Sequence, residues 1–317
     1  MSTIAYLTTY LSLIVFTAAV MIKIISYLKN PIHVRWELYP VAHEGKRAEY
    51  GGGYLEEVDW WKKPRNKSII GELKVMIPEI LFLKAVWENN RPLWYVTYPF
   101  HLGLYILIVF LSVLIIGAIL QLTGIQVGTG SESAFASAVG ALTNLAGPLG
   151  FLLCIAGAIG LFIKRLTDKS LKDYSSFGHF FNLLLFIIVM TIALITWLFV
   201  DSNFMMARDF IANLITFNFA SIESSLFASQ VIITVVLIAY IPLTHMAHFF
   251  MKYFLYHDIR WGDEPNIKTP ETDAKIAVVL NYPVSWSADH IKGDGSRKTW
   301  AEIATFNPAA TPEQEKE

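Results

Sequence analysis

Residues 94–122 read WYVTYPFHLGLYILIVFLSVLIIGAILQL, a run without a single aspartate, glutamate, lysine or arginine. A helix rises about 1.5 Å per residue, so a run of this length can cross a hydrocarbon core of about 30 Å. Lipid offers the backbone no hydrogen-bonding partners, so a chain crossing it must satisfy its own polar groups. The run therefore predicts a transmembrane helix.

Four further apolar runs with few or no charged residues occur along the chain, at residues 4–25, 134–163, 177–200 and 226–255. The composition agrees with them, because 54% of the residues are hydrophobic and only 16% are charged, whereas soluble domains have about 25% charged residues. The first run has no basic segment before it and no small-residue cleavage site, so we interpret it as a retained helix. We predict an all-α integral membrane protein, a bundle of five transmembrane helices.

The distribution of basic residues between the loops predicts the orientation. The segment between the first two runs and the connection at 164–173 are rich in lysine and arginine. By contrast, the loop at 124–133 has no basic residue, and the loop at 201–225 has only Arg208. Basic loops stay on the cytoplasmic side of a membrane. The N-terminus is therefore expected outside and the C-terminus in the cytoplasm.

These spans divide the chain into four regions. They are a first transmembrane helix at 1–27, a cytoplasmic loop at 28–93, a four-helix transmembrane region at 94–257 and a cytoplasmic tail at 258–317. Within the loop, apolar residues at 68–89 predict an amphipathic helix, which lies either at the membrane surface or under a partner subunit and which Pro78 would kink or split. The tail is polar and has no further span.

Histidines carry most of the functional information in this sequence. His101, His179, His245 and His248 lie in or at the predicted spans, where ionisable residues are rare and usually functional. Counted from the flanking charges, His101 and His245 lie about 10–15 Å inside the inner boundary, and the other two are shallower. One membrane histidine can simply hydrogen-bond across helices. Four at similar depth on three helices favour a shared site.

The pattern fits haem b, which needs two neutral imidazoles reaching iron from opposite sides at one depth. His101 and His245 meet the depth condition best, so we predict them as axial ligands of the haem iron. His179 and His248 are candidate contacts of a membrane quinone. The candidate cations for the haem propionates are Arg91, Arg165 and Lys252.

The segments around these histidines resemble a known family. YPFHLGL at 98–104 and PLTHMAH at 242–248 resemble the nitrate reductase gamma-subunit family. WELYP at 36–40 and NRPLW at 90–94 look more like one branch of it. In that branch the cytochrome b subunit is paired with heterodisulfide-reductase-like iron–sulfur subunits. The resemblance covers roughly residues 1 to 260.

The resemblance implies a subunit of a quinone-linked oxidoreductase complex in the cell membrane. Its substrate would be menaquinone or another quinone, and its partner a cytoplasmic iron–sulfur subunit; further membrane or extracytoplasmic cytochrome subunits are compatible with it. The family also has a second, outer haem, but its ligand positions are occupied here by Leu111 and Phe227. We therefore predict one inner-leaflet haem b, ligated by His101 and His245. The alternative is a second haem held by His179 and His248.

Other functional classes remain open at this point. A cofactor-free membrane anchor is one, and a transporter is another, although the spans contain almost no carboxylates. A membrane di-iron enzyme would need several histidine boxes, and only the pair His245 and His248 resembles one. Cys154 is the single cysteine, so no disulfide framework or cysteine-ligated cluster can form. With a net charge of −1 and no basic domain, no nucleic-acid partner is predicted.

Overall fold

The computed structural model describes residues 1–29, 58, 69–128, 130–248, 250, 270–284 and 298–305. Among these residues, five helices are long and apolar enough to cross a membrane. The chain is thus an all-α, multi-pass membrane protein, as the sequence predicts. Most of the predicted cytoplasmic loop, at 30–57 and 59–68, and much of the tail lie outside the described residues. The orientation of the bundle stays a prediction.

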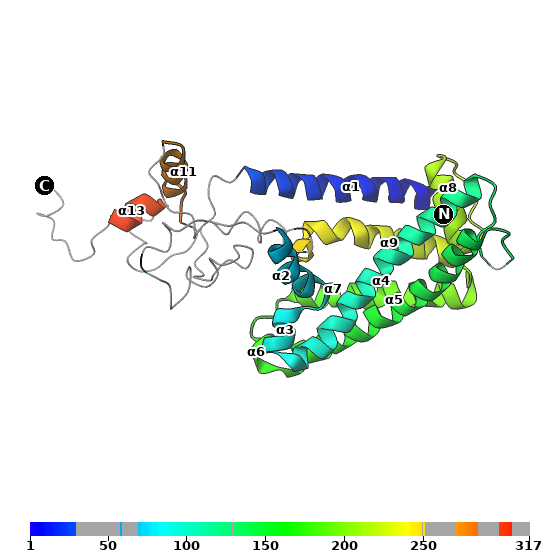
Figure 1. Ribbon diagram of the computed structural model, residues 1–317, viewed down its shortest axis with the longest axis horizontal. Helices are drawn as coiled ribbons and strands as arrows, with labels where there is room; N and C mark the ends of the chain where they lie inside the picture. Colours follow the sequence, from blue (N-terminus) through cyan, green and yellow to red (C-terminus); the bar gives the residue numbers. More distant parts are fainter. Residues whose placement is uncertain are drawn as a thin grey trace, which may run out of the picture. The chain divides into compact units, whose positions relative to one another are not determined.

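The chain forms two units, of which the first comprises residues 1–21 and 73–247. Its long helices are α1 (Ser2–Leu28, the end of which belongs to the second unit), α4 (Arg91–Leu122), α5 (Ala134–Thr167), α7 (Phe177–Phe199) and α9 (Ser225–Tyr240). Its short helices are α2 (Ile69–Leu81, the start of which belongs to the second unit), α3 (Lys84–Asn89), α6 (Lys169–Lys172) and α8 (Met205–Ile215). In Figure 1, α3 and α6 lie at one end of the bundle and α8 at the other.

The second unit comprises residues 22–72 and 248–317. Its described part includes α11 (Pro270–Leu280) and α13 (Trp300–Thr305). An isolated antiparallel bridge pairs Pro283 with Thr299. Beside it, the Val284 N–H donates to the Lys298 carbonyl at 2.9 Å. This short pairing brings the two helices of the tail together.

Glycines bring α4 and α5 into close contact. A Cβ added at Gly157 would lie 2.4 Å from the Phe100 backbone nitrogen, and one at Gly103 would lie 2.7 Å from the Cys154 nitrogen. Apolar side chains gain little from each other when lipid tails are equally apolar, so close approach through small residues drives helix association. This contact fixes Phe100, and therefore the adjacent His101, relative to α5.

Two buried clusters complete the packing of the first unit. In the larger one, the Phe100 ring meets the Phe186 ring edge to face at 5.1 Å, which joins α4 to α7. In the smaller one, Tyr6 of α1 stacks on Phe210 of α8 at 4.7 Å. The Tyr10 hydroxyl also donates to the Leu214 carbonyl at 2.7 Å. The start of α1 is therefore anchored on α8, at the end of the bundle opposite α3 and α6.

The predicted surface helix at 68–89 is two helices, α2 and α3, and the break does not fall at the proline. α2 continues through Pro78, and the chain turns at Leu83, which has a left-handed φ of 52°. Two hydrogen bonds hold this corner. The Ala85 N–H donates to Glu79 Oε2 at 2.9 Å, and the Trp94 indole N–H donates to the Phe82 carbonyl at 2.8 Å.

The fifth span also ends earlier than the sequence pattern predicts. α9 stops at Tyr240 and is followed by two 3₁₀ turns, Ile241–Leu243 and His245–Ala247. Pro242 explains this break, because it has no N–H to donate to the preceding turn and its ring disfavours a continued α-helix. His245 therefore lies in a turn beyond the helix, so its depth cannot be counted along a regular helix.

We expect Gly157→Ala to destabilise the bundle by about 1–3 kcal/mol, because its methyl group overpacks against the Phe100 backbone. The matched control is Ala156→Leu, which adds a larger group at an adjacent exposed position. The measurement is thermal unfolding of both variants in detergent, followed by circular dichroism. Equal melting temperatures for the two variants would contradict the proposed tight contact between α4 and α5.

Candidate functional site

The histidine-bearing segments share one end of the bundle. α4 and α7 begin at this end and α9 finishes there, together with α3 and α6 (Figure 1). This follows from the alternation of direction along a chain whose spans are joined by short connections. His101, His179 and His245 therefore lie towards the same end of the bundle, although they come from parts of the sequence that are far apart.

His179 and His245 form a pair of neighbouring rings. Their centroids are 4.8 Å apart and their planes are tilted by 48°. His179 also caps its own helix, because the Ser176 N–H donates to His179 Nδ1 at 2.9 Å. When Nδ1 accepts a hydrogen bond, the neutral ring carries its proton on Nε2. The tautomer of His179 is therefore set by the N-terminus of α7.

Two polar residues that the sequence reasoning missed support His245. The Tyr240 hydroxyl donates to Asn182 Oδ1 at 2.8 Å, and Asn182 Nδ2 lies 3.5 Å from His245 Nε2. Asn182 is only 5% exposed. Asn182 follows His179 by three residues in a mostly apolar helix, a spacing that places both on one face. That spacing was the available signal for its inclusion in the site.

His101 has the orientation expected of a ligating histidine. Its Nδ1 lies 2.9 Å from the Thr97 carbonyl oxygen, so this nitrogen carries the proton and Nε2 is the one presented to the surroundings. Ligating histidines usually donate their other N–H to a carbonyl or carboxylate in this way.

The imidazole nitrogens of His101 and His245 are of the type that ligates the iron of haem b. His101 is held by Thr97, and the 3.5 Å contact between His245 Nε2 and Asn182 is longer than the usual 2.7–3.2 Å. Asn182 therefore holds the His245 ring weakly, and the ring must turn from Asn182 before Nε2 can ligate iron. The ring pair in the structure is His245 with His179. Ligation by His101 and His245 stays a prediction.

Two of the three candidate cations, Arg91 and Arg165, have other partners in the structure. Arg165 Nη1 donates to Ser175 Oγ at 3.0 Å, and the Arg91 guanidinium lies 4.8 Å from the centre of the Trp87 ring. Their predicted pairing with propionates stays a prediction. Lys252, the third candidate, lies outside the described residues, and His248 is an exposed residue of the second unit.

The connection between α5 and α7 carries a strongly acidic carboxyl group. Hydrogen bonds from Ser170 and from Lys164 lower the pKa of Asp168 to about 2. Because the folded pKa is depressed, its stabilising contribution is present above the ordinary aspartate pKa of about 4 and is lost as the pH falls towards 2. The Lys164–Asp168 pair therefore persists at any physiological pH.

A separate polar cluster lies at the opposite end, around Arg208 of α8. Arg208 is 4% exposed, and its Nε and Nη1 atoms have no hydrogen-bond partner among the described residues. Burial lowers the pKa of the Arg208 guanidinium. Gly117 makes room for it, since a Cβ there would lie 2.8 Å from Arg208 Cδ. The sequence identified Arg208 only as the single basic residue of its loop.

Comparison of the chain with profiles of protein families, with curated proteins and with solved structures finds no match. The resemblance to the nitrate reductase gamma-subunit family therefore rests on the sequence segments quoted above. The histidine end of the bundle is therefore the basis for the proposed function.

We expect Asn182 and Tyr240 to be energetically coupled. Asn182→Ala leaves the Tyr240 hydroxyl without its acceptor, and Tyr240→Phe leaves the buried amide without its donor. Each change should cost about 1–3 kcal/mol, and the double variant should cost less than their sum. Unfolding in detergent measures all three, with Tyr174→Phe, an 86% exposed tyrosine, as the control. Strict additivity would show that the two side chains act independently.

Proposed function

We propose that this chain is the membrane cytochrome b subunit of a respiratory redox complex. It would transfer electrons between a membrane quinone and a cytoplasmic iron–sulfur subunit of the heterodisulfide-reductase-like type. The observation that carries the proposal is the gathering of His101, His179 and His245 at one end of a five-helix bundle. Ionisable side chains at such places are costly, and they persist where they have a function.

His101 and His245 are the proposed axial ligands. Haem b held by them supplies a one-electron carrier inside the bundle. The Thr97 carbonyl orients His101, and Asn182 together with Tyr240 orients the segment that carries His245. Arg165 lies at the same end and offers a positive charge for a propionate group.

The two positions at which an outer haem would need its ligands support the proposal of a single haem. Phe227, at the predicted position of an outer ligand, is 4% exposed and packs on Phe210 with ring centroids 6.2 Å apart. Leu111, at the other predicted position, is 45% exposed and faces away from the core. Neither residue can ligate iron. Electron transfer is therefore proposed to begin and end on the side where the histidines lie.

The first test is a visible spectrum of the purified full-length chain, dithionite-reduced minus oxidised, with stoichiometry from the pyridine haemochrome. We expect a b-type signal at one haem per chain. His101→Ala and His245→Ala should each abolish it, whereas His179→Ala should retain it. Two haems per chain would make His179 and His248 ligands. A purified chain without any haem would leave a membrane anchor or a transporter subunit.

The single-haem arrangement also predicts the electrical behaviour of the complex. When quinone chemistry and the partner subunit are on one side, turnover moves little net charge across the membrane. We expect a membrane-potential dye in proteoliposomes of the whole complex to respond weakly during turnover, with an ionophore-induced potential as the positive control. A strong response to turnover would contradict the one-sided arrangement.

A further inference from the structure

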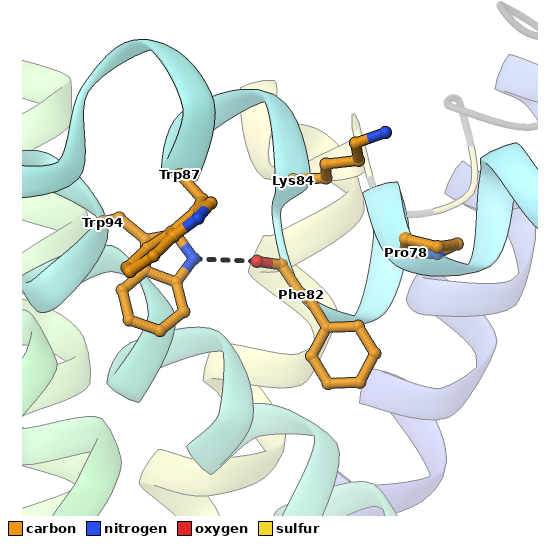
Figure 2. A pocket seen from close by; sticks show the side chains of 5 residues that line it. All are labelled: Pro78, Phe82, Lys84, Trp87 and Trp94. Atoms are coloured by element: carbon orange, nitrogen blue, oxygen red, sulfur yellow. Dashed lines mark hydrogen bonds between the residues drawn. The ribbon is translucent and has the colours of Figure 1, made fainter.

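A pocket lies between α2, α3 and the start of α4 (Figure 2). Its volume is about 270 Å³, and it is lined by Pro78, Phe82, Lys84, Trp87 and Trp94. The sequence analysis assigned it no role. All five residues belong to the first unit. The chain turns at Leu83, between α2 and α3, beside the pocket.

The pocket lies on the face of α4 that carries His101. Trp94, His101 and Tyr105 are spaced by seven and four residues, so they follow one face of the helix. α2 is fastened to both ends of this face, because the Trp94 indole donates to the Phe82 carbonyl and the Tyr105 hydroxyl donates to the Ile80 carbonyl at 2.6 Å. Trp94 precedes His101 by about 10 Å along the helix axis.

The walls offer flat aromatic surfaces and one unused donor. Trp87 and Trp94 meet edge to face at 4.8 Å, and Trp94 stacks on Tyr98 at 4.5 Å. The indole N–H of Trp94 is taken by Phe82, as the dashed line in Figure 2 shows. The indole N–H of Trp87 makes no hydrogen bond to any residue that the structure describes. A ligand oxygen can therefore accept from Trp87.

The charges around the pocket favour a neutral ligand. Arg91 lies 4.8 Å from the Trp87 ring centre, so a cationic ligand would be repelled. An anionic group such as a lipid phosphate needs converging cations. Here the Lys84 ammonium pairs with Glu88 at 3.6 Å. A planar, neutral molecule with acceptor oxygens matches the lining best.

We propose that this pocket binds the ring of a membrane quinone, with a ring carbonyl accepting from the Trp87 indole. Exposed apolar side chains beside it, Ile77, Leu81 and Phe82, give the isoprenoid tail a path into lipid. The inference rests on the proposed function, and it moves the quinone away from His179, whose ring is already engaged by Ser176 and His245. Leu83 supports it, because a left-handed non-glycine residue persists only where its surroundings hold it, often beside a ligand.

The test uses the full-length chain in lipid nanodiscs and an azide-bearing naphthoquinone with a short isoprenoid tail. After illumination, labelled peptides are mapped by mass spectrometry, with and without excess menaquinone. We expect competed labelling within residues 78–94. Trp87→Phe, which keeps the ring and removes the donor, should weaken competition by about 2- to 10-fold. The matched control is Trp197→Phe in α7, which loses an indole hydrogen bond to the Ser202 carbonyl and should leave competition unchanged.

Labelling around His179 and His245, or labelling that anionic lipid displaces and menaquinone does not, would overturn the inference. So would an equal effect of both tryptophan variants. The haem spectrum of the same samples separates the two proposals. Haem without labelling of the pocket leaves the cytochrome proposal standing and removes this one, whereas competed labelling without haem does the reverse.

Discussion

The close contact between α4 and α5 is the constraint on which the histidine end of the bundle depends. In lipid, apolar side chains gain nothing from leaving the solvent, so the contact must come from backbone approach. Gly157 and Gly103 permit that approach, and Phe100 is held between α5 on one side and Phe186 of α7 on the other. The direction of the next residue, His101, follows from this packing. The geometry of a site on this part of α4 therefore depends on Gly103 and Gly157, although neither glycine has a side chain that could bind a ligand.

The spans could be predicted from the sequence because they depend on one property, the length of an uncharged apolar run. Helix ends depend on several competing local contacts, and there the prediction was less accurate. Pro78 was expected to break the surface helix, but Glu79 and Trp94 fasten the corner one turn later, at Leu83. Pro242 was expected within a continuous fifth span, and there the helix does end. A proline marks a position where a helix can end at low energetic cost. The contacts of the neighbouring residues decide whether the helix ends there.

The candidate site shows the same division between what spacing can and cannot predict. Depth counted along the helices predicted that the histidines lie at one end of the bundle. In the structure, His101, His179 and His245 lie towards the same end. A count of residues along the helices could not predict which histidine rings are neighbours. His245 lies in a 3₁₀ turn, so its orientation does not follow from the period of an α-helix. Its neighbours are His179 and the Asn182–Tyr240 pair. A search of the sequence for histidines and charged residues does not find Asn182 or Tyr240.

The two ends of the bundle differ in what their polar groups can do. At the α8 end, the carboxylate of Asp201 accepts from the backbone N–H groups of Met206 and Ala207, and Arg208 is enclosed against Gly117. The Asp201 carboxylate holds the start of α8, and Phe227 is buried in the core at this end. At the other end, the His179 and His245 rings are neighbours, the Trp87 indole N–H makes no hydrogen bond to a described residue, and a pocket is open. The proposed exchange of electrons with a small molecule requires groups that can reach that molecule. This requirement favours the histidine end as the place of the proposed chemistry.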